Sequence, residues 1–201
     1  AEVSTGVSIQ LPDLPEGDLR GVNFSSDSKK MVFYINSDTS PSNLFTYQFG
    51  DKQAKRLTQT LNSDMNEANL VNSEVKRFKS FDDLVVPGLL YKPKNASASN
   101  KVPAMIWVHG GPGGQSRQNF SAFIQYLVNH GYAVLAVNNR GSSGYGKSFY
   151  QMDDLNHGDK DLKDCVEGKN WLAQQPEIDG EKIGIIGGSY GGYMTMAALT
   201  Y

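Results

Sequence analysis

The sequence predicts a chain of two parts, an antiparallel β-meander followed by an α/β domain. Three observations carry this prediction. Apolar and polar residues alternate in short runs over residues 19–58, as in half-buried strands. From residue 104 on, apolar runs alternate with segments of helical spacing, as in a parallel sheet covered by helices. A polar, Asn-rich stretch at residues 59–73 separates the two patterns and predicts a domain boundary there.

The first part contains four predicted strands. They occupy residues 22–24, 31–35, 45–49 and 54–58, and turn-forming residues separate them. Four strands in an up-and-down meander are the size of one propeller blade, although a single unit has no internal period and an isolated meander equally suits part of a sandwich. We assign residues 1–65 to a β-propeller-like blade and residues 66–201 to the second domain.

The second part begins with a predicted hairpin and continues as an α/β pattern. The hairpin pairs residues 75–81 with residues 84–91. The pattern that follows predicts a strand at 104–108, a helix at 120–128, a strand at 133–137, a helix at 162–172 after a long loop, and a buried strand at 183–186. Within the first of these helices, Phe120, Phe123, Tyr126 and Leu127 stand at helical spacing and are predicted to face the core.

Composition excludes several classes of function. The 201 residues are 39% hydrophobic and 20% charged, which is typical of a globular protein. The 19 Lys and Arg residues nearly balance the 21 Asp and Glu residues, so neither nucleic acid nor a membrane surface is an expected partner. No apolar run reaches the roughly 18 to 20 residues of a membrane-spanning helix. We therefore expect a soluble protein, whose compartment, cytoplasmic or exported, stays open.

A glycine-rich turn after the last predicted strand carries the strongest chemical signal. Gly187-x-Ser189-x-Gly191 stands between that apolar strand and a run of helix formers. A serine on so sharp a turn exposes its hydroxyl, and the tightness requires residues without side chains two positions before and after it. The following helix directs its first N–H groups at the same point. We predict Ser189 as a nucleophile and the N–H of Tyr190 as a donor to a substrate oxyanion.

The loop after the first apolar strand of the second part supplies the other candidates. It reads His109-Gly110-Gly111-Pro112. In folds with a nucleophile elbow, the second oxyanion donor comes from the loop at this place, so we predict the N–H of Gly111 as that donor. His109 either hydrogen-bonds the oxyanion or caps the strand and orients the loop. A phosphate cradle is disfavoured because no Gly-Lys-Ser or Gly-Lys-Thr follows.

Three further segments have distinctive sequences. They are Asn-Arg-Gly-Ser-Ser-Gly-Tyr-Gly at 139–146, Gly-Asp-Lys-Asp-Leu-Lys-Asp at 158–164 and Ile-Asp-Gly-Glu-Lys-Ile at 178–183. Together with the turn and the loop, they resemble the prolyl oligopeptidase family of serine peptidases, especially its acylaminoacyl-peptidase and dipeptidyl-peptidase-like branches. Residues 22–33 resemble a blade repeat of the propeller that precedes the hydrolase domain in this family. The resemblance implies the first half of an α/β-hydrolase domain behind a propeller's last blade.

The resemblance also implies roles for individual residues. Ser189 becomes the nucleophile, and Tyr190 contributes its N–H to the oxyanion site and its side chain to the pocket for the residue before the scissile bond. The chain has His109 where the branches that cleave after proline carry an oxyanion-binding tyrosine, which favours the acylaminoacyl-peptidase-like branch. Arg140 lies in a segment near the family's active site, and it suits a structural ion pair as well as a substrate contact.

The order of the catalytic residues predicts that this chain is incomplete. In α/β-hydrolases the triad follows the order Ser, Asp or Glu, then His. Residues 190–201 contain neither an acid nor a histidine, and His109, His130 and His157 all precede Ser189. We therefore expect truncation after the elbow, with the triad Asp and His outside the chain, and no activity from the chain alone.

Three functional hypotheses follow. The preferred one is a serine peptidase that hydrolyses short peptides through an acyl-enzyme at Ser189, of aminopeptidase, acylaminoacyl-peptidase or dipeptidyl-peptidase type. A carboxylesterase or lipase-like hydrolase is the first alternative, since the same elbow cleaves esters as readily. An inert fragment or pseudo-enzyme interaction module is the second. A peptide is the expected partner, no cofactor is needed, and residue preference, exo- or endopeptidase action and homo-oligomer formation by the parent stay open.

The remaining reactive side chains predict structural roles. The single cysteine, Cys165, excludes an internal disulfide and lies on an apolar helical face, so we expect it to be buried and inert. Asp159, Asp161 and Asp164 open the same helix, where acids complement the helix dipole and cap the first turn. No metal site is expected.

Overall fold

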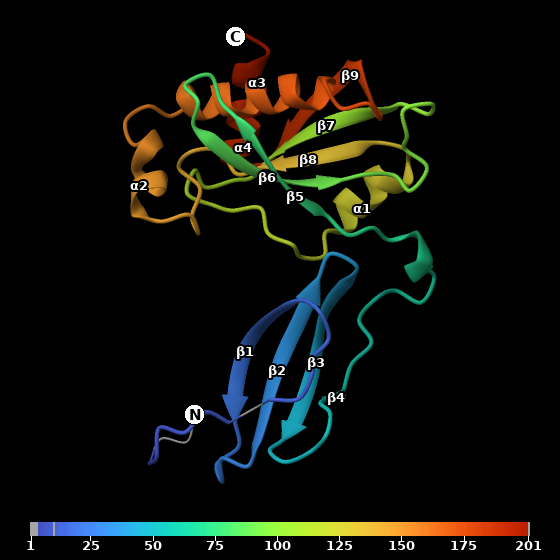
Figure 1. Cartoon of the computed structure of the whole chain (residues 1–201), viewed down its shortest axis with the longest axis vertical. Helices are drawn as coiled ribbons and strands as arrows, with labels where there is room; N and C mark the ends of the chain where they lie inside the picture. The colour runs from blue at the N-terminus through green and yellow to red at the C-terminus, as the bar shows by residue number, and fades with distance from the viewer. Residues whose placement is uncertain (1–3, 10, 201) are drawn as a thin grey trace. The chain divides into compact units, whose positions relative to one another are not determined.

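The computed structural model describes residues 4–9 and 11–200 and divides into two compact units (Figure 1). Unit 1 comprises residues 1–68 and 118–121, and unit 2 comprises residues 69–117 and 122–201. The division after Ala68 falls inside the polar stretch at residues 59–73.

Unit 1 is built on a four-stranded antiparallel sheet with its strands in chain order. The strands are β1 (Asp18–Phe24), β2 (Lys30–Ser37), β3 (Ser40–Gln48) and β4 (Lys55–Arg56). Because side chains alternate between the faces of a strand, Phe33 of β2 and Phe45 of β3 share one buried face. They are partners in register, and their rings stack with centroids 5.9 Å apart. The predicted meander is confirmed.

The other face of this sheet is apolar and exposed. Val32 and Tyr34 of β2 have exposed fractions of 37% and 45%. Val32 and Tyr34 alternate along β2 with the buried Met31, Phe33 and Ile35, as the burial pattern of this strand shows. The sheet of unit 1 therefore has apolar side chains on both faces, and only one face is covered by described residues of that unit.

Unit 2 contains a five-stranded sheet in the order β5-β6-β8-β7-β9. The strands are β5 (Glu74–Lys79), β6 (Val85–Tyr91), β7 (Val102–Val108), β8 (Ala133–Val137) and β9 (Ile178–Gly187). Strands β5 and β6 form the predicted hairpin, and β6 joins β8 antiparallel. Strands β8, β7 and β9 run parallel to one another, so the predicted α/β pattern is confirmed.

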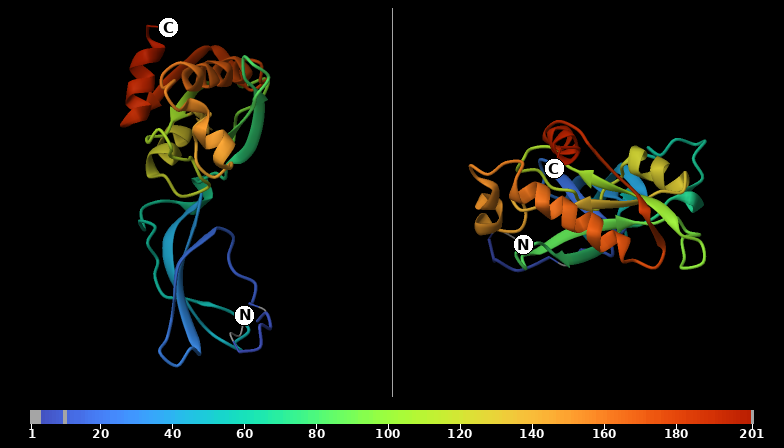
Figure 2. Two further views of the ribbon diagram at one scale, coloured as in Figure 1. Left: turned by 90° about the vertical axis from the view of Figure 1, so that its left-hand side faces the viewer. Right: turned by 90° about the horizontal axis from the view of Figure 1, so that it is seen from above.

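Helices cover both faces of this sheet, and α1 and α3 lie on opposite sides of it (Figure 2). Helix α1 (Ala122–Asn129) packs Ile124, Leu127 and Val128 on one face. Helices α3 (Lys160–Ala173) and α4 (Tyr190–Ala198) pack on the other, with Leu172 and Met194 fully buried. The short elements are α2 (Lys147–Tyr150) and the 3-10 helices η1 (Glu67–Asn69) and η2 (Gln151–Asp153). The sequence predicts a long loop where α2 and η2 lie.

The prediction for the buried face of α1 is confirmed for Leu127, which is buried, and is wrong for Phe123 and Tyr126. Phe123 and Tyr126 are 46% and 56% exposed. The rotation of the helix is fixed instead by Gln125, whose buried amide accepts from the N–H of Val71 at 3.0 Å and donates to its carbonyl at 2.8 Å. A buried amide needs such partners, and this pair turns the aromatic side chains outward.

The last predicted strand is less buried than its apolar residues indicated. Ile183 and Ile185 are only partly buried, because β9 is the edge strand of the sheet that the described residues form. Strand β8, in the middle of the sheet, matches the expected burial, since all five of its residues are buried, whereas buried and partly buried residues alternate along β7.

Candidate active site

The turn between β9 and α4 has the geometry of a nucleophile elbow. Ser189 has φ +56° and ψ −124°, a conformation that costs a non-glycine residue about 1–3 kcal/mol. A Cβ on Gly187 would lie 2.5 Å from the Gly191 carbonyl oxygen, and one on Gly191 would lie 2.1 Å from the Val108 carbonyl oxygen. Both positions therefore exclude any side chain, as the sequence predicted.

Helix α4 begins directly after Ser189. The N–H groups of Gly192 and Tyr193 donate to the Ser189 carbonyl at 2.9 and 3.1 Å, which closes the first turn. Tyr190 is the first helical residue, so its N–H has no acceptor within the helix. This N–H and the helix dipole are available to an anionic oxygen beside the serine.

The loop after β7 lies against the elbow. In the parallel pair β7 and β9, Val108 is the register partner of Gly187, so both strands deliver their following loops to the same edge of the sheet. A Cβ on Gly110 would lie 3.3 Å from the Ser189 Cβ and 3.8 Å from its Oγ. Gly111 has φ +142°, and a Cβ there would meet the Gly114 nitrogen at 2.4 Å. The structure thus brings the predicted nucleophile and the predicted oxyanion loop together.

His109 uses both ring nitrogens within the protein. Nδ1 lies 2.8 Å from the carbonyl oxygen of Gly110, and Nε2 lies 2.8 Å from Oγ of Ser142. The residue is 9% exposed, and burial lowers the pKa of the imidazole. Of the two roles considered for His109, this geometry matches the one in which the ring orients the loop.

Tyr190 is anchored through its hydroxyl. The hydroxyl donates to the carboxylate of Asp161, whose other oxygen accepts from the N–H groups of Gly158 and Leu162 at 2.8 and 2.9 Å. Burial raises the pKa of Tyr190, and the bond to Asp161 raises it further. The ring packs edge-on against His157 with centroids 5.7 Å apart. The side chain that the resemblance assigns to a substrate pocket is therefore held in a fixed position.

Arg140 makes ion pairs within unit 2. Its side chain is 4% exposed and lies between Asp164, at 2.8 Å from Nη2, and Asp82, also at 2.8 Å from Nη2. Its guanidinium carbon lies 4.8 Å from the centroid of the Phe81 ring. The hydrogen bond to Arg140 lowers the pKa of Asp82 to about 2. Of the two readings of Arg140, the structural ion pair is the one observed.

A third buried carboxylate of unit 2, after Asp161 and Asp164, lies under the loop that follows β8. Asp153 is 2% exposed, and a Cβ on Gly141 would lie 2.2 Å from its carboxyl group. Its Oδ2 has no hydrogen-bond partner and lies 3.5 Å from Nε2 of His157. Burial raises the pKa of Asp153.

Two acids in α3 have buried roles that differ from the capping roles predicted for them. Asp159 pairs with Lys163 at 2.7 Å and makes no side-chain capping bond, whereas Asp161 and Asp164 are fully buried. The available signal was the periodicity. Residues 161, 164, 165, 168 and 172 share one helical face, so both acids stand on the stripe that buries Cys165 and Leu172. No pattern in the sequence predicts that Ser142 is a hydrogen-bond partner of His109.

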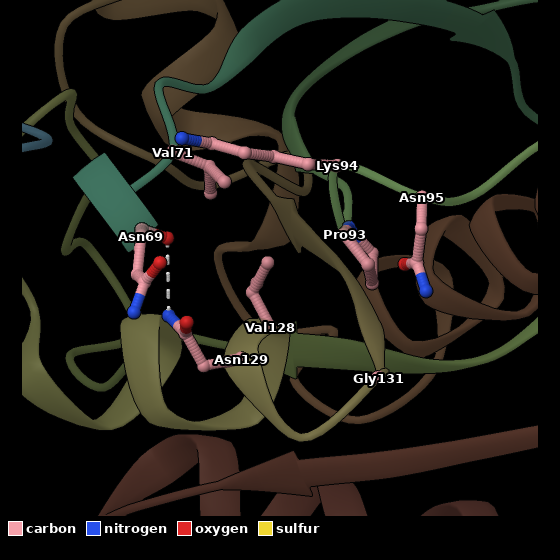
Figure 3. Close-up of a pocket in the computed structure, with 8 residues that line it drawn as sticks. All are labelled: Asn69, Val71, Pro93, Lys94, Asn95, Val128, Asn129 and Gly131. Carbon is pink, nitrogen blue, oxygen red and sulfur yellow. Dashed lines mark hydrogen bonds between the residues drawn. The ribbon is translucent and has the colours of Figure 1, made fainter.

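The structure also has features away from this site. A cavity of about 220 Å³ is lined by Asn69, Val71, Pro93, Lys94, Asn95, Val128, Asn129 and Gly131 (Figure 3). It shares no residue with the predicted site. Among the described residues, no cluster of His, Cys, Asp and Glu could hold a metal ion, and no helix is long and apolar enough to cross a membrane. Cys165 is buried, and burial raises the pKa of its thiol.

Comparison with known proteins identifies relatives for most of the chain. Residues 118–201 match the model of the prolyl oligopeptidase family. The chain is 30% identical over 200 residues to dipeptidyl aminopeptidase BIII of Pseudoxanthomonas mexicana, covering 96% of this chain and 29% of that protein. It is 31% identical over 115 residues to the acylamino-acid-releasing enzyme of Mus musculus, covering 57% of this chain and 16% of that protein. The chain thus spans less than a third of these relatives.

Solved structures give the same picture. Pyrococcus horikoshii acylaminoacyl peptidase matches with a TM-score of 0.73 and 32% identity, over 94% of this chain and 30% of that one. A puromycin-hydrolyzing peptidase of Mycobacterium tuberculosis has a TM-score of 0.79 at 24% identity, over 86% of this chain and 27% of that one, and supports the fold alone.

Proposed function

We propose that this chain is the nucleophile-bearing part of a serine peptidase that hydrolyses short peptides through an acyl-enzyme at Ser189, because residues 118–201 match the model of the prolyl oligopeptidase family. The relatives in this family are dipeptidyl peptidases and acylamino-acid-releasing enzymes. The observation that carries the proposal is the strained backbone of Ser189 on a turn whose flanking glycines exclude any side chain.

The reaction starts with attack of Ser189 Oγ on a peptide carbonyl. A serine hydroxyl is a weak nucleophile at neutral pH and requires a base to take its proton. The carbonyl oxygen becomes an oxyanion, which accepts from the N–H groups of Tyr190 and Gly111. Expulsion of the amine leaves the acyl-enzyme, and water then releases the acid. Both donors belong to the backbone, so the oxyanion site depends on loop geometry more than on side-chain identity.

The base and its orienting acid are proposed to lie outside residues 1–201. In the order typical of this fold they follow the serine, and the chain spans 29% of a relative that it matches along 96% of its own length. We infer that the isolated chain is inactive and that its parent protein is the enzyme.

Unit 1 fits the last blade of a β-propeller, with the blade at residues 1–65 and the hydrolase domain at residues 66–201. A blade is packed between neighbouring blades, so it needs apolar side chains on both faces. Phe33 and Phe45 supply one face, and Val32 and Tyr34 supply the exposed one. Neighbouring blades would cover this second face.

The substrate class is a peptide with a small or blocked N-terminal unit. His109, in place of an oxyanion-binding tyrosine, favours an acylaminoacyl-peptidase-like activity over strict cleavage after proline. The ring of Tyr190, held by Asp161 and packed against His157, is placed to line the pocket for the residue before the scissile bond.

The test compares rates on an aminoacyl anilide and a short-chain ester in the whole protein that carries this chain. Ser189→Ala should lower kcat on the anilide by roughly 10⁴ to 10⁶. Activity within tenfold of the wild type would contradict the nucleophile assignment. A preference for the ester would favour a carboxylesterase, and failure of a fluorophosphonate probe to label Ser189 would favour a pseudo-enzyme.

A further inference from the structure

The hydrogen bonds around His109 allow its protons to be counted. Carbonyl oxygens only accept, so the 2.6 Å contact between Ser142 Oγ and the Asn139 carbonyl uses the one hydroxyl proton of Ser142. Ser142 Oγ must then accept from Nε2–H of His109 at 2.8 Å. By the same rule, Nδ1–H of His109 donates to the Gly110 carbonyl at 2.8 Å. All these contacts are satisfied together only when both ring nitrogens carry a proton.

Charge and burial act on this ring in opposite directions. Burial disfavours the charged form, whereas the Gly110 carbonyl and the negative charge of Asp153 favour it. Among the described residues, Asp153 is the ionisable group whose charge acts on His109. The hydroxyl of Ser142 is a neutral acceptor that also favours the protonated form of the ring. Burial has the larger effect and lowers the pKa of His109, so Ser142 opposes that shift as an acceptor and fixes the ring in place.

Ser142 is itself held rigidly. It is fully buried, and its own N–H bonds the Asn139 carbonyl at 3.0 Å. Two residues before it, the N–H of Arg140 donates to Asp164 at 2.8 Å, and the Arg140 guanidinium binds Asp164 and Asp82. This clamp, formed by Arg140, Asp164 and Asp82, fixes segment 139–142 to helix α3 and to the turn between β5 and β6. The side chain of Ser142 is therefore held in a fixed position beside the loop at residues 109–111.

The support reaches the loop next to the nucleophile. His109 is followed by Gly110, which lies against Ser189, and by Gly111, the proposed oxyanion donor. We propose that Ser142 is a positioning residue of the active site, which holds the imidazole of His109 and through it the oxyanion loop at 109–111. This inference rests on the proposed function, because it concerns the same oxyanion site.

The kinetic test uses the whole protein that carries the chain. Ser142→Ala should lower kcat on an aminoacyl anilide about tenfold with KM within about twofold, because a displaced donor costs less than the 10² to 10³ of a removed one. The inhibition constant of a peptidyl aldehyde, which mimics the tetrahedral state, should rise in parallel. In a double-mutant cycle, Ser142→Ala should add little to His109→Gln, since Ser142 acts through that ring.

The matched control is Ser116→Ala. The hydroxyl of Ser116 is buried near the same loop and has no hydrogen-bond partner, so its removal should leave kcat unchanged. Melting curves of each variant separate misfolding from misplacement. Equal kinetics for the two serine variants, or fully additive effects of Ser142→Ala and His109→Gln, would overturn the proposal.

A second readout needs no activity. In ¹⁵N-histidine NMR titrations, Ser142→Ala should lower the pKa of His109, because the protonated ring loses an acceptor, while Ser116→Ala should leave that pKa in place. An unchanged His109 titration in Ser142→Ala would refute the contact on which the proposal depends. If the wild-type protein hydrolyses no anilide, the proposed peptidase function fails, and the titration alone then decides whether Ser142 holds the ring.

Discussion

Removal of the Asp164 carboxylate should strongly destabilise unit 2. This fully buried group accepts from the Arg140 N–H and Nη2 at 2.8 Å, from Nε at 3.0 Å, and from the Ser80 hydroxyl at 2.5 Å. Asp164→Ala leaves the guanidinium of Arg140, which is 4% exposed, with a single carboxylate partner, Asp82. Removing one member of a buried ion pair typically costs about 3–5 kcal/mol, because the other charge stays buried without compensation.

The structure places the expected cost at the lower end of that range. Asp82 remains in contact with Arg140 at 2.8 Å and offsets part of the charge, so we expect about 3 kcal/mol for Asp164→Ala. For a domain of this size, that corresponds to a fall in Tm of about 10 °C. Asp82→Ala is the matched comparison. Its side chain is 40% exposed, and an exposed pair contributes about 1 kcal/mol or less.

Thermal and urea unfolding followed by circular dichroism measure both variants. We expect the wild type to have the highest free energy of unfolding, Asp82→Ala a slightly lower one, and Asp164→Ala a value well below both. Equal losses for the two variants, or a loss below 1 kcal/mol for Asp164→Ala, would refute the argument that burial sets the strength of this clamp.

Three further predictions concern other parts of unit 2. Gly191→Ala should abolish the native elbow, because its Cβ would overlap the Val108 carbonyl oxygen. Gly188→Ala should melt within a few degrees of the wild type, since nothing lies within 4 Å of its Cβ. Melting curves of the two variants test this difference. Cys165 should react with a maleimide only after unfolding, because burial raises the pKa of its thiol, and fast labelling of the native protein would contradict this. Arg140 lowers the pKa of Asp82 from 3.8 to about 2. The pair's contribution to the free energy of unfolding is therefore present above about pH 4 and is lost as the pH falls toward 2. Asp82→Asn should remove that part of the acid dependence in stability curves, and an unchanged slope would contradict the pairing.

The elements that the sequence predicted are those with a strong local signal. The meander follows from period-two runs such as Met31, Phe33 and Ile35, since alternation fixes which face is buried. The elbow follows from Gly187-x-Ser189-x-Gly191, because the turn permits no other residues at its flanks. In both cases the pattern that predicts the element lies within a few neighbouring residues of the sequence.

The features that the sequence could not predict depend on contacts between distant segments. Arg140 meets Asp82 across 58 residues and Asp164 across 24, and a charged residue in a sequence does not reveal whether it is buried. Gln125 rotates α1 by bonding Val71 across 54 residues, which no periodicity of apolar residues records. Such polar contacts are decided by the assembled fold.

The glycines of the elbow also fix the register of the sheet. Val108 and Gly187 are partners in β7 and β9, and the Val108 carbonyl oxygen would lie 2.7 Å from a Cβ on Gly187 and 2.1 Å from one on Gly191. A slip of one residue along β9 would set Ile186 or Gly188 opposite Val108 and would turn every side chain of the strand to the other face. The same slip would move Ser189 away from Gly110. The residues that permit the sharp turn therefore also hold two loops, far apart in the sequence, at the distance that a shared oxyanion site requires.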